Sequence, residues 1–511
     1  MSFYSILFET PEDRRGGDPA EEPAFFADLN CDQIVAAITA GKDEYDLKTF
    51  FYMPLHRVEA VNYRHEVMQD LEMTSLREAI DSFAQAMRDI RDHLLRVSKL
   101  HCREQQQAWF LDAVELYCRA ITSLAHALSA KEPSSRGLQR LRDYLAQYAG
   151  SNRFNSLATG ATELKAALAT VQYCVQIHGD GFTVRRYQGE ADYSIEVEAT
   201  FEKFKQGAAR DYKMKFGDSD DINHIEAKIL EFVAQLHPEA FHPLEAFCDK
   251  NSEFIDRTIA EFDREVQFYL AYLDYIAVLR GIGLRFCYPR VSNSSKEIRS
   301  CDGFDIALAH KLAAENSSIV CNDFYLEGND RVLVISGPNQ GGKTTFARAF
   351  GQLHYLASIG CPVPGRAAQL FLFDRLYTHF EKEEKVENLR GKLEDDLIGV
   401  RKILDLATSQ SIIIMNEVFT STTIQDELFL SMKVMEKISA LGALCVWVTF
   451  VDELASFSPQ TVSMVSTVVA ENPALRTFKI ERRPADGLAY AMAIAQKHGL
   501  TFDSIMKRIK S

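Results

Sequence analysis

A glycine-rich segment, residues 337–344, leaves few ways to fold the part of the chain around it. It follows the apolar, β-branched run 332–335, which predicts a buried strand. Apolar side chains then recur at helical spacing, at Phe346, Phe350, Leu353 and Leu356. The spacing Gly-x-x-x-x-Gly-Lys-Thr between a strand and a helix is that of a P-loop, whose backbone N–H groups and helix N-terminus bind phosphate oxygens. We therefore expect an α/β domain with a nucleotide site here.

Two side chains of this loop have defined tasks. A P-loop lysine reaches the β- and γ-phosphates and the hydroxyl residue after it binds Mg²⁺, so Lys343 and Thr344 take these roles. The alternative is a chance glycine-rich turn before a helix, which both flanks of the loop disfavour. The sequence thus predicts that ATP and Mg²⁺ are bound by Gly337, Pro338, Asn339, Gln340, Gly341, Gly342, Lys343 and Thr344.

A second motif lies downstream, where the apolar run 412–415 ends in Asn416 and Glu417. An acidic group at the end of such a strand orients or deprotonates the water that attacks the γ-phosphate. We expect Glu417 to be this catalytic group and Asn416 to contact Mg²⁺ through its water shell. Because asparagine carries no charge, we expect weaker Mg²⁺ coordination than an aspartate would give. The alternative for Glu417 is an ordinary solvated carboxylate at a strand end.

Hydrophobic periodicity divides the rest of the chain. Helical spacing dominates from about 44 to 130 and from about 223 to 284. Between these stretches, the alternating residues around Gly179-Asp180-Gly181 predict a β-hairpin. From about 285, short apolar runs alternate with amphipathic stretches, which predicts parallel strands, and the late runs near 462–470 and 477–481 are consistent with an antiparallel edge hairpin. The fold class is therefore a long helical part with a small β insert, followed by an α/β P-loop domain.

The composition is that of a globular, multidomain chain. Its 511 residues exceed one compact core, and 47% hydrophobic with 25% charged residues are globular values. A formal net charge of −15 argues against a surface that is basic throughout, although not against a local basic patch. The ten cysteines lack metal-type spacing and predict buried free thiols of a reducing compartment. With no long apolar run and no signal-peptide pattern, we expect no membrane span and a cytoplasmic location.

Several segments resemble the MutS family of DNA mismatch-repair ATPases. The run Gly-Pro-Asn-x-Gly-Gly-Lys within 337–344 is far more specific to that family than the general P-loop spacing. The resemblance covers nearly the whole chain after about residue 40 and is strongest over 317–500. Other similar segments are 320–323, 359–364, Asn416-Glu417 with Thr422 and Asp426, 487–491, and residues 47–71 at the start of the family's core domain.

The resemblance implies a domain order and further site residues. It implies an N-terminal extension over 1–40, a helical core and lever domain over 41–290 with a short β-containing insert at about 171–216, and an ABC-type ATPase and dimerisation domain over 291–511. Each nucleotide site would be completed by the partner in a homodimer. By the same resemblance, residues near the nucleotide are Val320 and Asn322 at the adenine, Thr345 beside the P-loop, and Asn339 near the γ-phosphate in a catalytic role.

The chain also departs from the family pattern. The first 40 residues leave no room for the family's mismatch-reading domain and lack its phenylalanine-x-glutamate motif. Phe450 falls near the position of a family histidine, and a phenylalanine cannot do polar work. No serine occurs in residues 388–393, the segment that caps the partner's nucleotide in the family. Our hypothesis is that Arg390 or Lys392 completes the site in trans, or that hydrolysis is slow.

The insert between the helical stretches contains candidates for DNA contacts. Basic groups contact phosphates and aromatic rings stack on bases, and the two kinds interleave here. The alternative is a solvated amphipathic helix with its aromatic rings packed inward. The candidates are Lys203, Lys205, Arg210, Lys213 and Lys215. A second basic cluster over 88–103 is interspersed with aspartates and predicts an ion-paired helix face instead.

The expected function is that of a shortened MutS-like ATPase. It would hydrolyse ATP to ADP and phosphate, dimerise through the P-loop domain, and clamp branched or mismatched DNA in repair or recombination. A different class stays open: a slow nucleotide switch whose lever arms hold a protein partner without touching DNA. Whether positive charge gathers at the lever tips distinguishes the two.

Overall fold

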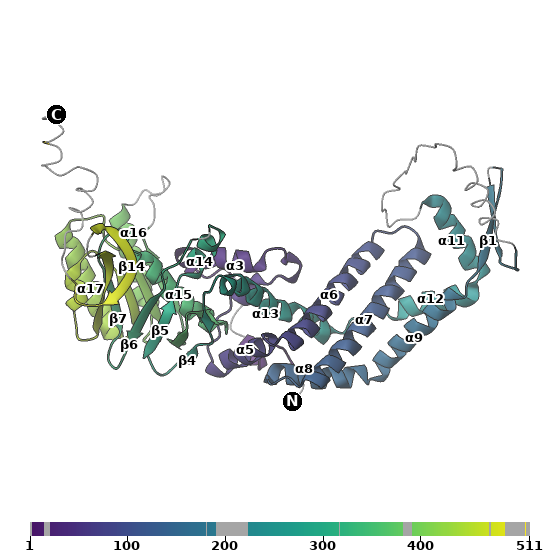
Figure 1. Ribbon diagram of the computed structural model, residues 1–511, viewed down its shortest axis with the longest axis horizontal. Coiled ribbons are helices and arrows are strands. Elements are labelled where there is room, and N and C mark those ends of the chain that lie inside the picture. The colour runs from purple at the N-terminus through teal and green to yellow at the C-terminus, as the bar shows by residue number, and fades with distance from the viewer. Residues whose placement is uncertain are drawn as a thin grey trace. The chain divides into compact units, whose positions relative to one another are not determined.

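The computed structural model describes residues 3–14, 21–179, 181–190, 223–315, 317–381, 391–469, 472–485 and 506. The chain forms two compact units, each built from separate stretches of sequence (Figure 1). Unit 1 comprises residues 1–3, 74–133 and 139–263, and unit 2 comprises residues 4–73, 134–138 and 264–511. The division into these two units does not test the predicted domain limits at residues 40 and 290.

Unit 1 consists mainly of long helices, as the periodicity predicts. The apolar stripe of α6 is buried and packs on α7, which lies beside it in Figure 1. That stripe comprises Leu76, Ile80, Phe83, Met87 and Ile90. The helices are α6 (Thr74–Val97), α7 (Arg103–Lys131), α9 (Asn152–Ala169), α11 (His224–Leu236) and α12 (Pro238–Lys250), while α8 (Arg136–Ala149) and α13 (Arg257–Gly281) contribute residues to both units.

The predicted hairpin is present in unit 1. Strand β1 (Tyr173–His178) pairs antiparallel with β2 (Gly181–Arg186), with His178 opposite Gly181. Gly179 has a φ of +60°, in the left-handed region that glycine adopts without strain. The hairpin packs on α11, and Arg186 donates to the carbonyl of Leu236 at the end of that helix. The part of the predicted insert beyond residue 190 lies outside the described residues.

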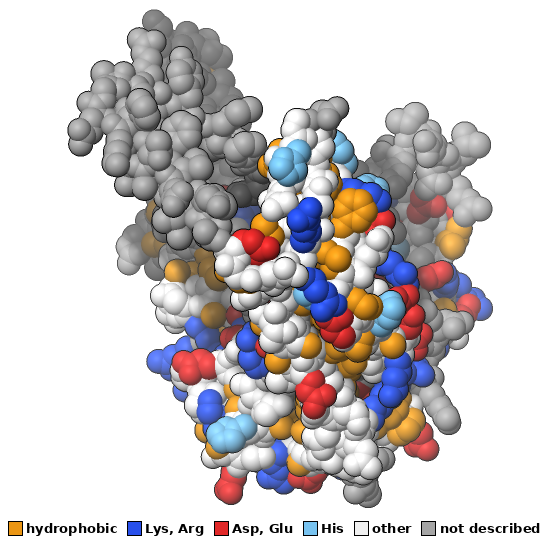
Figure 2. Space-filling view, turned by 90° about the vertical axis from the view of Figure 1, so that its right-hand side faces the viewer, with side chains coloured by type: hydrophobic (Ala, Val, Ile, Leu, Met, Phe, Trp, Pro, Cys, Tyr) orange, Lys and Arg blue, Asp and Glu red, His pale blue; other side chains and the backbone are white. Residues whose placement is uncertain are grey.

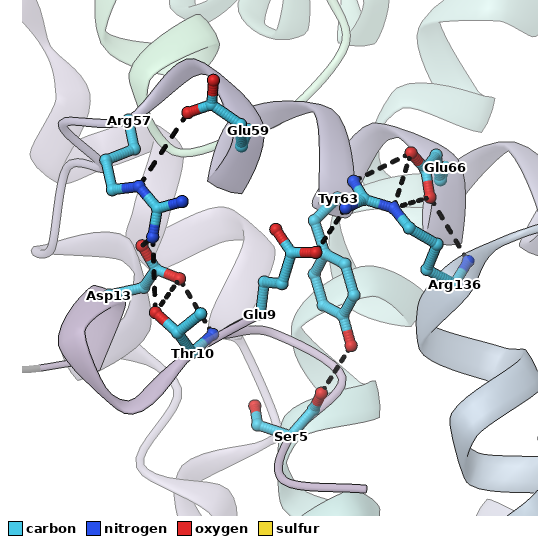
Figure 3. A network of polar contacts seen from close by, with 9 residues as sticks. All are labelled: Ser5, Glu9, Thr10, Asp13, Arg57, Glu59, Tyr63, Glu66 and Arg136. Atoms are coloured by element: carbon cyan, nitrogen blue, oxygen red, sulfur yellow. Dashed lines mark hydrogen bonds and ion pairs between the residues drawn. The ribbon is translucent and has the colours of Figure 1, made fainter. Parts of the chain in front are cut away.

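Unit 2 combines an N-terminal group of short helices with an α/β part. A polar network holds the N-terminal segment to α5 (Figure 3). In it, Arg136 donates to Glu66 over 2.9 Å and also pairs with Glu9, while Tyr63 Oη donates to the carbonyl of Ser5 over 2.7 Å. The helices are α1 (Pro11–Arg14), α2 (Phe26–Leu29), α3 (Cys31–Thr39), η1 (Asp43–Tyr45), α4 (Lys48–Phe51), α5 (Val58–Leu71), α14 (Ile306–Ala314), α15 (Lys343–Ser358), α16 (Lys392–Leu406), α17 (Ile424–Leu441) and η2 (Asp452–Ser456).

Three sheets form the β part of unit 2. The largest has six strands in the order β10-β11-β12-β7-β13-β14, of which only the edge strand β14 runs antiparallel to its neighbour. Its strands are β10 (Leu376–Phe380), β11 (Ile412–Asn416), β12 (Leu444–Val448), β7 (Val332–Ser336), β13 (Thr461–Val469) and β14 (Asn472–Arg482). The smaller sheets pair β3 (Phe286–Cys287) with β8 (Val363–Pro364), and join β4 (Arg290–Ser292), β9 (Ala367–Phe371), β5 (Ile298–Gly303) and β6 (Asn322–Leu326).

The six-stranded sheet is covered on both faces. Trp447, Met415 and other buried side chains of its central strands pack with α16 and α17 in one apolar cluster. Helix α15, which begins at the P-loop lysine, contacts β11 and β12. Because β7, β11 and β12 are parallel, their carboxyl ends meet at one edge of the sheet. The segments after these three strands therefore form a common site.

Two further expectations concern the whole chain. All ten cysteines are free thiols, as predicted, but only five are buried and the other five are half-buried. Among the described residues, no helix combines the length and the apolar character needed to cross a membrane.

Candidate nucleotide site

The glycine-rich loop 337–342, which the sequence predicts to be a P-loop, joins strand β7 to helix α15. Gly337 and Gly342 have φ values of +114° and +92°, which glycine adopts without strain. Ser466 on β13 donates its hydroxyl to the carbonyl of Gly341 over 2.7 Å, and a Cβ at Gly341 would lie 2.2 Å from that hydroxyl oxygen. Strand β13 therefore packs directly against the loop, and this close approach explains why residue 341 is a glycine.

The side chain of Lys343 lies inside the loop. Its Nζ donates to the carbonyls of Gly337 over 3.1 Å and Pro338 over 3.3 Å. It also lies 4.4 Å from the ring centroid of Phe450, which comes two residues after the end of β12. Burial lowers the pKa of Lys343, and the carboxylate of Glu417 opposes this shift. The ammonium group is thus held where a P-loop lysine reaches phosphate.

Thr344 contacts the second motif directly. Its Oγ1 donates to Oδ1 of Asn416 over 2.9 Å, which joins the start of α15 to the end of β11 across the intervening strand β12. Asn416 is buried and the hydroxyl of Thr344 faces it. Oxygen ligands of this kind suit Mg²⁺, which prefers one or two protein ligands and several waters. The donor set fits a magnesium ion but supplies no negative charge of its own.

Glu417 follows β11 in an unusual backbone conformation. Its φ is +54°, in a region that non-glycine residues rarely occupy, and its backbone N–H donates to the carbonyl of Val448 over 2.9 Å. Burial raises the pKa of its carboxyl, Lys343 lowers it, Glu381 raises it and Lys392 lowers it. A raised pKa brings a carboxyl closer to the range useful for a general base.

A cavity of about 480 Å³ adjoins the P-loop. Its polar lining residues include Lys343, Thr344 and Glu417. Its apolar lining residues include Phe324, Phe346 and Leu353. A cavity that combines a cationic side chain with apolar surface has the chemistry to bind a nucleoside phosphate.

The predicted site residues differ in where the structure places them. The cavity is lined by Gln340 to Thr345 and by Val320 and Asn322. Asn339 is instead exposed, and its carbonyl accepts a hydrogen bond from Arg476 over 3.1 Å. Gly337 and Pro338 contribute the carbonyls that hold Lys343. The DNA-contact candidates Lys203, Lys205, Arg210, Lys213 and Lys215 lie outside the described residues.

Sequence reasoning missed the contribution of β14. Phe478 interrupts this strand with a φ of +57° and lines the cavity next to Gly342. Asn322 holds the interruption from both sides, since its Nδ2 donates to the carbonyl of Phe478 and its Oδ1 accepts from the N–H of Ile480. Nothing in the local sequence signals this, because the contact joins residues 156 or more positions apart.

This chain is similar in sequence to known proteins. A family model described as MutS domain V matches residues 333–509. A DNA mismatch repair protein MutS from Solibacter usitatus is 27% identical over 381 residues, 73% of this chain and 41% of that protein. Proteins of the same description from Thermotoga neapolitana and Thermotoga maritima are 25% and 24% identical over 53% and 56% of this chain, and 32% and 35% of their own lengths.

Together these matches support a MutS-family protein. The resemblance expected from the P-loop and its flanks is thereby confirmed, and the chain spans less than half the length of these relatives. Against the MutS pattern, Asn416 and Phe450 remain the departures at the site, and the structure places both in contact with P-loop residues. Of the segment 388–393, residues 391–393 are described, and Lys392 there pairs with Glu381 of its own chain.

The basic cluster over 88–103 is ion-paired, as predicted, although with other helices. Arg91 pairs with Asp263 of α13 and Arg103 pairs with Glu245 of α12. Figure 2 shows the face of the molecule at the right-hand side of Figure 1, where basic and acidic side chains are interspersed over the coloured surface. On the part of that face that the structure describes, neither sign of charge dominates.

Proposed function

We propose that unit 2 binds ATP with Mg²⁺ and hydrolyses it to ADP and phosphate. The observation that carries this proposal is the hydrogen bond between Thr344 and Asn416, which brings the P-loop and the end of β11 into one site with Lys343 and Glu417. A P-loop domain of the ABC type, with its limits at about 291 and 511, is the fold that we propose for this part. The family described above supports the assignment.

Each residue has a distinct part in this proposal. The P-loop N–H groups and the α15 N-terminus bind the phosphates, and Lys343 moves from its own loop carbonyls to the γ-phosphate oxygens. Thr344 and Asn416 would hold a hydrated Mg²⁺, which would supply charge neutralisation at the phosphates. Glu417 accepts a hydrogen bond from the attacking water and takes its proton as the new oxygen–phosphorus bond forms, while the bond between the γ-phosphorus and the bridging oxygen breaks and ADP leaves. We propose that Val320, Asn322 and Phe478 contact the adenine of the nucleotide.

We further propose that the protein acts as a homodimer on DNA, as an ATP-dependent clamp in mismatch repair or recombination, in a cytoplasmic compartment. Exposed apolar side chains on two helices beside the site support the homodimer. These are Leu397 and Ile398 on α16 with Ile424 and Phe429 on α17. In such a dimer Arg390 or Lys392 would complete the partner's site. The alternative is a slow switch that holds a protein partner, which the mixed charge in Figure 2 favours.

The test is ATP hydrolysis by the purified chain, alone and with single-stranded, duplex, mismatched and four-way-junction DNA. Lys343→Ala is the blank, and Lys402→Ala, at an exposed lysine of α16, is the matched control. We expect Lys343→Ala to abolish hydrolysis and Lys402→Ala to leave it intact. Stimulation by one DNA form supports the clamp, whereas equal rates with every DNA favour the protein-partner switch. Equal rates in both lysine variants would contradict the ATPase assignment.

A further inference from the structure

Asp396 of α16 is a buried carboxylate that the proposed reaction does not use. Only 7% of the residue is exposed. Its Oδ1 lies 2.8 Å from Nε2 of His379 on β10. Its Oδ2 accepts the backbone N–H of Phe419 over 3.1 Å, in the segment directly after Glu417. Both oxygens are therefore engaged, one by the edge strand and one by the segment that carries the proposed base.

The segment after β11 needs such a contact because its backbone is strained. Glu417 and Phe419 have φ values of +54° and +67°, a conformation that L-residues adopt only when the surroundings hold them. Phe419 is buried, so its N–H would have no water to bond if Asp396 were absent. The hydrogen bond from Asp396 thus helps to fix the direction in which Glu417 points.

A second contact pair reinforces the first. Lys392 and Asp396 lie one turn apart on α16, and they pair with Glu381 and His379, two residues apart at the end of β10. Each pair also reaches the segment after β11, since Thr420 Oγ1 lies 3.5 Å from Oε1 of Glu381. The start of α16 is therefore connected to the Glu417 segment at two points.

We propose that Asp396, held in place by His379, is a positioning residue that sets the geometry of Glu417 for water attack. The proposal rests on the ATPase function proposed above. Neither Asp396 nor His379 lines the nucleotide cavity. The pair therefore acts on the chemical step and not on nucleotide affinity, and a displacement of α16 is transmitted to the proposed base.

The first test compares Asp396→Ala with Asp405→Ala. Asp405 lies on the same helix, is exposed and pairs with Arg401 one turn away, so it is a matched control. For Asp396→Ala we expect kcat to fall about 10- to 100-fold, since small misplacements of a reacting group have effects of this size, while KM stays within about threefold. A kcat equal to that of the control, or a loss confined to KM, would overturn the proposal.

Substitution of His379 separates positioning from general destabilisation. His379→Ala frees the carboxylate, whereas His379→Gln keeps an N–H group near Oδ1, so we expect the glutamine variant to recover kcat relative to alanine. Should Asp396→Ala fail to fold, Asp396→Asn, which keeps the volume, takes its place. Equal kcat in the two His379 variants would overturn the role of the histidine.

Amide hydrogen exchange at Phe419 tests the same contact without using activity. We expect faster exchange there in Asp396→Ala than in Asp405→Ala, with similar thermal midpoints. If the wild-type chain does not hydrolyse ATP, the proposed ATPase function is wrong, but amide exchange at Phe419 still tests the contact with Asp396. Unchanged exchange at Phe419 in an active enzyme would sink the positioning role alone.

Discussion

At the residue scale, the carboxyl of Glu417 is sensitive to two charged neighbours outside the P-loop. Its pKa is raised by burial and by Glu381, and lowered by Lys343 and Lys392. A general base works as the carboxylate, so activity is present above the pKa and is lost as pH falls through it. A raised pKa places this loss at a higher pH than for an exposed glutamate. We predict that Glu381→Gln moves the acid limb of kcat to lower pH and Lys392→Ala moves it to higher pH.

The measurement is the pH profile of kcat at saturating ATP for both variants. Glu394→Gln, at an exposed carboxyl of α16, is the control for a general change in surface charge. The two variants should shift the limb in opposite directions around this control. A shift of the same sign in both would mean that Glu417 does not set the acid limb.

Arg64 is a second residue whose environment predicts a measurable effect. Its guanidinium is fully buried, donates to the carbonyls of Leu7 over 3.0 Å and Ile359 over 2.8 Å, and lies over the rings of Phe8 and Phe268. Ile359 ends the helix that begins at the P-loop, so the cation also sits at a favourable helix C-terminus. We predict that Arg64→Ala lowers the free energy of unfolding by about 3–5 kcal/mol, because it leaves two buried carbonyls unpaired and a cavity.

Urea unfolding monitored by circular dichroism gives this free energy. Arg401→Ala is the matched control, since the side chain of Arg401 is 70% exposed and pairs over 2.7 Å with Asp405, which is 55% exposed. We expect it to change this free energy little, because exposed ion pairs contribute little to stability. A cost for Arg64→Ala as small as that of the control would contradict the structural role of the guanidinium.

Residues of the site differ in how far the sequence predicts them. Lys343, Thr344 and Glu417 are predictable, because their roles depend on spacing within a strand–loop–helix unit. Asp396 and Phe478 are not, because their roles come from contacts made only after distant elements assemble. The hydrogen bond of Asp396 spans 23 positions and involves a backbone N–H, which leaves no mark in side-chain chemistry. Spacing rules therefore find the groups that we propose to touch phosphate, and they miss the groups that hold those side chains in place.

At the element scale, α16 packs so closely on β10 that one helix position requires glycine. A Cβ at Gly399 would lie 2.5 Å from Cε1 and 2.7 Å from Nδ1 of His379. The histidine cannot turn away freely, since Asp396 holds its Nε2. Glycine-to-alanine changes inside helices usually stabilise by about 0.5–1 kcal/mol. Here we predict that Gly399→Ala destabilises by about 1–3 kcal/mol, the usual cost of overpacking.

A double-mutant cycle measures this steric effect by urea unfolding. In a His379→Ala background, the obstruction is absent, so Gly399→Ala should revert to a stabilising change. The reversal of sign is the expected outcome. A destabilisation of equal size in both backgrounds would show that His379 is not the obstacle and that α16 sits differently on the sheet.

The elements themselves are predicted better than their pairing. Apolar runs predict β7, β11 and β12, and the alternation around Gly179 predicts the hairpin of β1 and β2, because both signals are local. The late hairpin is present as β13 and β14, at the edge of the sheet. Its first strand also pairs parallel with β7, from Thr461 opposite Val332 to Val465 opposite Ser336, which periodicity does not reveal. Strand order depends on long-range contacts that no single segment encodes.

At the scale of the whole molecule, each unit combines stretches far apart in sequence. Residues 4–73 join the α/β part through contacts such as that of Tyr355 on α15, whose hydroxyl donates to the carbonyl of Phe51 over 2.8 Å. The boundary at residue 40 that the resemblance implies does not reveal this, and periodicity cannot detect it, because helices of both units have the same amphipathic pattern. Chain length therefore predicts more than one compact part but not which residues belong to each part.

The distribution of charge over the whole molecule bears on whether the protein binds DNA. On the described face in Figure 2 the charges are mixed, whereas residues 203–215 contain five basic residues and one acidic residue. If this stretch contacts phosphates, replacing its four lysines by glutamine should weaken binding to every DNA sequence alike. Each lost phosphate contact should also reduce the slope of log affinity against log salt by about one. The four lysines are Lys203, Lys205, Lys213 and Lys215.

The control replaces four basic residues that already pair with an acid within one helical turn. These are Arg77, Lys228, Arg401 and Lys433. Both variants change the net charge equally, so a loss of long-range attraction would affect them alike, while lost contacts would affect only the first. Fluorescence anisotropy over a salt series measures both slopes. A lower affinity with an unchanged slope, or equal effects in the two variants, would contradict the proposal of a DNA clamp. Either result would favour the alternative in which the lever arms hold a protein partner.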